Sequence, residues 1–278
     1  MSKDQKDKKI EKKVEELNEE SNKQKSQEKI LISQLSEGME AFEENKIKVF
    51  ISALTAGMEI GFSYLLIAIL YTFLEGKFSK EAIFFIVAFT YPVGFIIVVL
   101  GKSVLFTEQT SLLALPVLHK KRKISELLQL WGIVIIGNLI GGAIMTVIIV
   151  SVGNGMGIIS YESVSAIALH ITKASTLVIF GSAILAGWLM ALLSWLVTSA
   201  SETIGRIVVI YMITAVVGFA GFHHSIVGNI EVLAGLIFTD AISFGTYATF
   251  QTTALIGNAF GGVFFVALLR YRAFQANF

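Results

Sequence analysis

Residues 221–229 read Gly221-Phe222-His223-His224-Ser225-Ile226-Val227-Gly228-Asn229, a polar, glycine-rich stretch inside an apolar run long enough to cross a membrane. Polar groups and irregular backbone at that depth are stable only where protein or a water-filled cavity surrounds them. A second such interruption, Gly101-Lys102-Ser103-Val104-Leu105-Phe106-Thr107-Glu108-Gln109-Thr110, begins 120 positions earlier. The two breaks predict a pair of interrupted helices that meet inside the membrane.

The composition predicts an all-α integral membrane protein. Of the 278 residues, 54% are hydrophobic and 15% are charged, and the mean hydropathy is +0.72; soluble domains carry about a quarter charged residues. Residues 1–45 hold nine of the 22 Lys and Arg and 12 of the 21 Asp and Glu. A net charge of +1 without a long basic run gives no reason to expect a nucleic-acid partner. The absence of cysteine excludes disulfides and thiolate nucleophiles.

Six transmembrane spans follow if each needs about 20 apolar residues. The second and fifth runs are too long for one simple span, and each contains a break, so we expect two half-helices in each. The predicted spans are 49–74, 82–118, 128–152, 174–199, 206–238 and 249–270.

The spans divide the chain into three parts. Residues 1–45 form a charged cytosolic tail, which contains no apolar signal-peptide region. Within it, apolar residues over 30–42 recur at helical spacing and predict a short amphipathic helix, either on the membrane surface or against a partner helix. Residues 46–272 form the channel domain, and 273–278 a cytosolic C-terminal tail.

The distribution of basic residues predicts that both termini face the cytosol. The inner segments would carry the tail, His119-Lys120-Lys121-Arg122-Lys123, Arg206, Arg270 and Arg272, whereas the outer loops hold Lys77, Lys80 and Lys173. We expect a bacterial inner membrane.

An internal repeat supports two related halves. Gly137-Asn138-Leu139-Ile140-Gly141-Gly142 in span three recurs 120 positions later as Gly257-Asn258-Ala259-Phe260-Gly261-Gly262 in span six. Halves of three spans each have opposite topology, because an odd number of crossings reverses the direction of the chain. In such inverted repeats the broken helices form the site near the midplane.

Several polar residues at the breaks are candidates for the site. Thr107 and Ser225 stand where a helix N-cap is expected, and each half-helix then directs a partial positive charge and free N–H groups toward the membrane centre, an arrangement that favours a small anion. His224 is able to exchange a proton near neutral pH, although a neutral ring bonded to a backbone carbonyl is the alternative. His223 is its neighbour, but adjacent side chains diverge and make a poor metal chelate.

Other residues near the breaks have two interpretations each. Leu105 and Phe106 form either a hydrophobic constriction or ordinary core. Lys173 either gathers anions at the outer mouth or is simply solvated. Lys102 and Glu108 either pair with each other or extend into an aqueous vestibule. Glu59 and Glu231 are charged residues in apolar surroundings without an evident partner.

Together these motifs resemble the formate/nitrite transporter family over residues 46–272. The resemblance rests on Leu105-Phe106-Thr107, Gly137-Asn138, Gly-Phe-x-His-Ser at 221–225 and Gly257-Asn258-x-x-Gly261-Gly262. It implies an aquaporin-like protomer of six spans with its own pore, a homopentamer, and passage of formate, nitrite or hydrosulfide. Thr107 matches the pore threonine, His224 the central histidine and Asn258 an asparagine near the pore. Leu105 and Phe106 match the constriction, and Lys173 loosely matches a vestibule lysine.

The chain departs from the family pattern at four places. Val104 stands where an acid commonly precedes Leu-Phe-Thr, and His223 where a glutamate commonly precedes the central histidine. Gly187 replaces an asparagine common in span four, and the spacing from His224 to Asn229 is one residue longer than usual. With these departures the chain resembles a divergent branch of the family, and they bear mainly on substrate identity.

The leading hypothesis is a channel or proton-coupled transporter for a small monovalent anion, with proton exchange at His224. The alternative is an aquaporin-like facilitator for a neutral solute, against which Leu105 and Phe106 count because they interrupt a polar file. An intramembrane enzyme is a weaker hypothesis, since no His-Glu-x-x-His, Gly-x-Ser-x-Gly or paired aspartate motif occurs. No cofactor and no metal site are expected.

Overall fold

A computed structural model describes residues 26–275, and this part of the chain contains helices and no strands. The predicted tail therefore lies largely outside the described residues, and only its end is seen. In chain order the helices are α2 (Gln27–Glu43), α3 (Lys46–Glu59), α4 (Gly61–Leu74), α5 (Lys80–Ala88), α6 (Pro92–Gly101), α7 (Phe106–Leu118), α8 (Ile124–Gly155), α9 (Tyr161–Thr172), α10 (Thr176–Ser199), α11 (Thr203–Ala220), α12 (Ser225–Phe238), α13 (Phe244–Gly262), the π-helix η1 (Val263–Leu268) and α14 (Leu269–Gln275).

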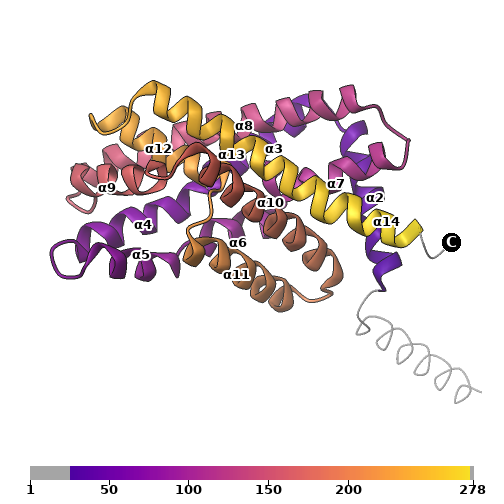
Figure 1. The fold of residues 1–278 in the computed structure, drawn as a ribbon, viewed down its shortest axis with the longest axis horizontal. Coiled ribbons are helices and arrows are strands. Elements are labelled where there is room, and N and C mark those ends of the chain that lie inside the picture. Colours follow the sequence, from indigo (N-terminus) through magenta and orange to yellow (C-terminus); the bar gives the residue numbers. More distant parts are fainter. Residues whose placement is uncertain (1–25, 276–278) are drawn as a thin grey trace, which may run out of the picture.

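Six helical segments are long and apolar enough to cross a membrane, as the sequence predicted. They are Lys46–Leu74, Lys80–Gly101, Ile124–Gly155, Thr176–Ser199, Thr203–Ala220 and Phe244–Ala273. Figure 1 shows α9 and the connection between α4 and α5 at one end of the bundle, and α2, α14 and the C-terminus at the other. With the predicted orientation, the first of these would be the outer end.

Both predicted breaks are present, but they are shorter than expected. The chain leaves helical geometry at residues 102–105 and at 221–224, so that the polar residues after each break already belong to α7 and α12. Each break begins with a left-handed residue: Lys102 has φ 58° and Gly221 has φ 62°. Gly101 was the expected counterpart of Gly221, but it ends α6 in helical conformation and the positive φ falls on a lysine.

Glycines of the repeated motif bring pairs of helices into contact at equivalent places. A Cβ atom on Gly141 of α8 would collide with the Leu54 carbonyl of α3, and one on Gly261 of α13 would collide with the Ile184 carbonyl of α10. In lipid, such close backbone approach replaces the hydrophobic effect as the source of helix association. The repeat detected in the sequence thus fixes the α3–α8 and α10–α13 pairs.

The last glycine of each motif contacts the broken helix of the opposite half. Gly142 of α8 lies against the Asn229 side chain of α12, and Gly262 of α13 lies against the Thr110 hydroxyl of α7. The two halves are therefore interlocked at the breaks, and the position of each half-helix depends on both halves.

Two elements were not predicted from the sequence. The second span is interrupted a first time between α5 and α6, where Ser63 Oγ donates to the Tyr91 carbonyl (2.6 Å) and accepts the Gly94 N–H (2.9 Å). Pro92 at the start of α6 was the available signal. The second element is α9, whose N-cap Ser160 accepts the Ser163 N–H; a loop was predicted here.

The predicted helix over residues 30–42 is part of α2, and it packs against protein. Its buried residues are Ile30, Leu31, Gln34, Gly38 and Phe42. Gly38 approaches the Leu112 carbonyl and Pro116 of α7, and Gln34 Nε2 donates to Ser194 Oγ of α10 (3.3 Å). Of the two interpretations of this helix, the structure favours the partner helix.

Candidate functional site

The two breaks meet at a hydrogen bond between Thr107 of α7 and His224 at the start of α12. Thr107 Oγ1 lies 2.6 Å from His224 Nε2, and these residues are 0% and 2% exposed. The contact joins residues that are 117 positions apart. The structure therefore brings together the two polar residues that the sequence singled out, one from each half of the chain.

The partners of His224 define its tautomer. His224 Nδ1 accepts the backbone N–H of Val227 (3.2 Å), and a ring nitrogen that accepts a hydrogen bond carries no proton. The proton of the neutral ring is therefore on Nε2, which donates to Thr107 Oγ1. The Thr107 hydroxyl keeps its own hydrogen for another acceptor.

His224, and not Ser225, is the N-cap of α12, because its ring accepts the Val227 N–H. The prediction that Ser225 and Thr107 are N-caps was wrong: Ser225 is the first residue of α12, and α7 begins at Phe106 after an N-cap at Leu105. The position of an N-cap is uncertain by one residue when a serine follows another side chain that also accepts hydrogen bonds, as Ser225 follows His224.

Asn138 and Asn258 hold the two breaks in equivalent ways. Asn258 Oδ1 accepts the Ser225 N–H (2.8 Å), and its Nδ2 donates to the carbonyls of Ala183 (2.7 Å) and His223 (3.0 Å). Asn138 Oδ1 accepts the Phe106 N–H (2.8 Å), and its Nδ2 donates to the carbonyls of Ala53 (2.7 Å) and Val104 (2.9 Å). The first N–H group of each half-helix is thus satisfied by an asparagine. The sequence-based prediction was that these N–H groups are free.

A cavity of about 570 Å³ reaches His223 and His224; it is called the outer cavity below, after the orientation predicted from the sequence. Lys80 and Lys173 lie on its wall, as the vestibule interpretation of Lys173 requires, together with His170 of α9. Lys173 Nζ contacts His170 Nδ1 at 3.2 Å. Burial, followed by the charges of Lys173 and His223, lowers the pKa of His170 to about 4, so this ring is neutral at pH 7.

His223 has structural partners of its own. Its Nε2 is 3.0 Å from the Ile171 carbonyl, to which it donates, and its Nδ1 is 2.8 Å from Ser182 Oγ. The ring therefore points away from Thr107 and ties the break to α9 and α10. Ser182 Oγ also accepts the His223 N–H at 3.0 Å.

A smaller cavity of about 280 Å³, called the inner cavity below after the same predicted orientation, lies on the other side of the breaks. It is lined by charged residues of α2 and α3 and by Lys102, Val104 and Gln109. The predicted Lys102–Glu108 pair is not formed: Gln109 Nε2 donates to Glu108 Oε2 (3.2 Å), and the ion pairs seen within residues 26–275 do not include either member. Lys102 faces the inner cavity, in agreement with the vestibule interpretation.

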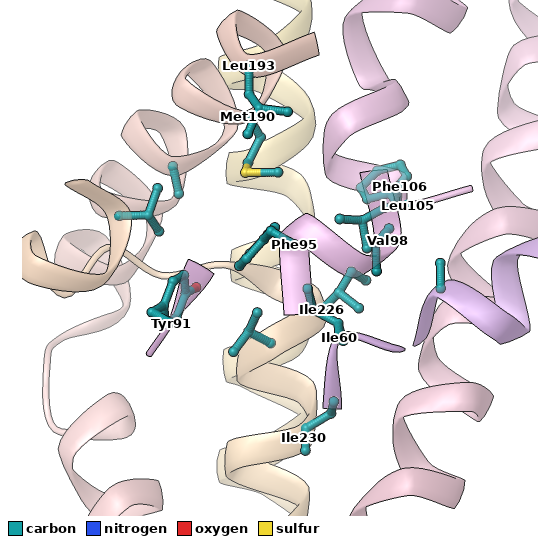
Figure 2. Close-up of a cluster of buried hydrophobic side chains, with 14 of the residues drawn as sticks. Ile60, Tyr91, Phe95, Val98, Leu105, Phe106, Met190, Leu193, Ile226 and Ile230 are labelled. Atoms are coloured by element: carbon teal, nitrogen blue, oxygen red, sulfur yellow. The ribbon is translucent and has the colours of Figure 1, made fainter. Parts of the chain in front are cut away.

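Apolar side chains surround the breaks. Figure 2 shows Leu105, Phe106 and Val98 grouped on one side of Phe95, with Tyr91 on the other. The Phe95 ring stands edge-on to His224 with 5.1 Å between ring centroids, and Phe106 is edge-on to Trp131 of α8 at 5.6 Å. Leu105 and Phe106 are fully buried, so both belong to the apolar layer that encloses the Thr107–His224 contact.

Sequence reasoning missed two residues near the site. Asn138 was quoted in the repeat and in the family resemblance without a role of its own, although its hydrogen bonds match those of Asn258. Glu231 was noted without a partner, but the structure places it on the wall of the outer cavity with His224. Its spacing of seven residues from His224, which puts both on one helix face, was the signal available.

These features define an integral membrane protein whose two broken helices meet at a buried polar contact with a cavity on either side. Residues 28–272 match the family described as Formate/nitrite transporter, and the chain belongs to this family of channels and transporters. The Inner membrane protein YfdC of Escherichia coli (strain K12) is 31% identical over 241 residues, which are 84% of this chain and 74% of that protein. Formate channel BtFdhC of Bacillus thuringiensis is 26% identical over 191 residues, 66% of this chain and 71% of that protein.

Two solved structures share the fold. One described as an FNT family ion channel has a TM-score of 0.76 and 21% identity, and the match covers 88% of this chain and 98% of that chain. Another, described as a pentameric formate channel with formate bound, has a TM-score of 0.71 and 22% identity over 83% of this chain and 98% of that chain.

Proposed function

We propose that the protein is a channel or transporter for small monovalent weak-acid anions such as formate or nitrite. The observation that carries the proposal is the buried hydrogen bond of Thr107 with His224, in a chain that belongs to the formate/nitrite transporter family. A relative named as a formate channel and a similar fold with formate bound support this substrate class.

The proposed path runs from the outer cavity through the polar contact to the inner cavity. Lys173 concentrates anions at the outer mouth. The anion then displaces the Thr107–His224 bond, accepting hydrogen bonds from the Thr107 hydroxyl and from His224 Nε2–H. Leu105 and Phe106 act as the constriction that excludes hydrated ions.

Asn258 supports this path by fixing the backbone around Ser225 and His223. The positive end of the α12 dipole at Ser225 adds to the attraction for a negative charge. His223 is a positioning residue in this proposal, because both of its ring nitrogens bond to Ser182 and Ile171.

Proton exchange at His224 stays a prediction, and it would require His224 to give up the hydrogen bond that caps α12. The neutral ring can donate an Nε2 hydrogen bond to an anion, but it can transfer that proton only if Nδ1 becomes protonated as well. A protonated Nδ1 would face the Val227 N–H, donor against donor, and α12 would lose its cap. We therefore give His224 the role of hydrogen-bond donor.

Uptake of labelled formate and nitrite into proteoliposomes, at two pH values and against protein-free vesicles, tests the function. Thr107→Val removes one hydroxyl and is expected to lower uptake about tenfold, which is the worth of one hydrogen bond. Thr214→Val is the matched control, since the buried Thr214 hydroxyl bonds only within α11, to the Ile210 carbonyl (2.7 Å). Uptake no faster than in protein-free vesicles, or equal effects of both variants, would contradict the proposal.

The same vesicles test the alternative of a neutral-solute facilitator. Swelling in glycerol at the rate of protein-free vesicles is expected, because the apolar layer around Leu105 and Phe106 offers a neutral polyol few hydrogen bonds. Rapid glycerol entry without formate uptake would reverse the assignment.

We also propose that the protein is a homopentamer in a bacterial membrane, with both termini of each chain in the cytosol. Each chain would consist of the tail up to residue 45, the channel domain over 46–272 and a short C-terminal tail. A detergent-corrected mass of five 30.3 kDa chains is the expected result. Protease accessibility in oriented vesicles tests the placement of the termini.

A further inference from the structure

Glu231 is a buried acid that shares the outer cavity with His224. Positions 224, 228 and 231 recur at helical spacing, and His224, Gly228 and Glu231 all line the cavity. Glu231 is 6% exposed. The same face of α12 therefore carries the central histidine and, two turns further out, a carboxyl group.

The surroundings of Glu231 contain phenols and no close cation. Tyr91, which precedes α6, lines the same cavity, and Tyr64 of α4 lies within electrostatic range of Glu231. The Tyr64 hydroxyl is fully buried and finds no hydrogen-bond partner among the described residues. The ion pairs found within residues 26–275 do not include Glu231. The other titratable or charged groups on the cavity wall are Tyr71, Lys80, Glu81, His170, Lys173, His223 and His224.

An ionised carboxylate at this place would oppose the proposed function. Burial without a cation disfavours its charge, and a fixed negative charge repels an anion arriving from the mouth. A protonated carboxyl removes both problems, because it is neutral and donates a hydrogen bond. One proton shared between Glu231 and a bound carboxylate satisfies both groups.

On the basis of the proposed function, we propose that Glu231 carries the proton that crosses with the anion. The Glu231 O–H bond breaks as an O–H bond forms on the anion oxygen, which leaves Glu231 as a carboxylate and formate as formic acid. The neutral acid then crosses the apolar layer around Leu105 and Phe106. Glu231 is reprotonated from outer water through the cavity, so one anion and one proton enter per cycle.

This assignment divides the work between two residues of α12. His224 keeps Nδ1 on the Val227 N–H and supplies only a hydrogen bond, whereas Glu231 lines the outer cavity, through which it gains and loses a proton. His223 does not take this role, because Nε2 donates to the Ile171 carbonyl and Nδ1 contacts Ser182. The chain lacks an acid directly before His224, and Glu231 supplies one further along the same face.

The test compares formate uptake over outer pH 5 to 8 for the wild type, Glu231→Gln and Glu231→Asp, with protein-free vesicles subtracted. Glu162→Gln, an exposed acid of α9, is the matched control, and His170→Gln removes another titratable group of the cavity wall. Wild-type formate uptake should rise by up to about tenfold for each unit by which the pH falls, because it follows the fraction of Glu231 that is protonated. Glu231→Gln should lose this rise, while Glu231→Asp, Glu162→Gln and His170→Gln keep it.

Infrared difference spectra between acid and neutral pH give a readout that does not depend on transport. A protonated-carboxyl C=O band is expected in the wild type and not in Glu231→Gln. The assignment would be overturned if the wild type and Glu231→Gln showed the same carboxyl band, or if formate uptake by Glu231→Gln kept the pH profile of the wild type. If the wild type shows the band but transports neither formate nor nitrite, the proposed function fails and the protonatable Glu231 stands.

Discussion

His224 performs two tasks with one ring, and the two tasks use different nitrogens. Nδ1 caps α12 through the Val227 N–H, and Nε2 bonds to Thr107 of the opposite half. A histidine cap at this position places the single N–H group of the neutral ring in the apolar layer between the cavities. The stability of α12 and the polarity of the site are therefore linked through a single side chain.

Substituting His224 separates the two tasks. His224→Ala removes both bonds, whereas His224→Asn retains a side-chain oxygen suited to an N-cap but is too short to occupy the Nε2 position. Relative to alanine, asparagine is expected to restore about 1 kcal/mol of stability, with uptake remaining as low as in His224→Ala. Thermal unfolding in detergent and vesicle uptake measure the two effects. Recovery of both together would show that the ring contributes only through the cap.

At residue scale, the sequence predicted which polar groups meet but not how they bond. Thr107 and His224 were found because hydroxyl and imidazole groups are costly in lipid without partners. The double role of His224 and the equal bonding of Asn138 and Asn258 depend on atoms brought together from segments 32 to 117 positions apart. Such pairings leave no local pattern in the chain.

At the scale of helices, the glycines at equivalent repeat positions set the distance between packed pairs. Gly141→Ala and Gly261→Ala each direct a methyl group into a carbonyl of the facing helix. We expect a loss of about 1–3 kcal/mol for each, since overpacked helices must separate. Gly132→Ala on α8 is the control, because no atom lies within 4 Å of the added Cβ, and it should be neutral or slightly stabilising. The melting temperatures of the three variants test this expectation. If Gly141→Ala and Gly261→Ala melted at the same temperature as Gly132→Ala, close packing at these glycines would be contradicted.

Helix boundaries were predicted well where hydropathy alone determines them and less well where side chains intervene. The six spans follow from apolar length, and both breaks follow from polar clusters. The additional break at Tyr91 depends on the Ser63 hydroxyl from α4, which no periodicity reveals. The left-handed residue of the first break is Lys102 rather than its neighbour Gly101, although glycine adopts positive φ without steric cost; a lysine at such a position escapes composition-based reasoning.

At the scale of the whole molecule, different charged residues line the mouths of the two cavities. The outer mouth holds Lys80, Glu81, Lys173 and a neutral His170. The His170 ring is stacked on Phe84 with 3.5 Å between ring centroids. The inner mouth is lined by acidic and basic residues of α2 and α3, with Lys102. Acidification therefore adds positive charge at the outer end by protonating His170 beside Lys173.

The folded protein is expected to lose stability as the pH falls because of His170. Its pKa is about 4 in the folded state and about 6.5 when unfolded, so the unfolded chain binds more protons between these values and stability rises with pH there. Melting in detergent should occur at a lower temperature at about pH 4.5 than at pH 7. His170→Gln should reduce that drop because a neutral side chain remains beside Lys173, whereas His119→Gln at the opposite end should leave the drop unchanged. An equal drop in His170→Gln and the wild type would show that other groups govern the acid sensitivity.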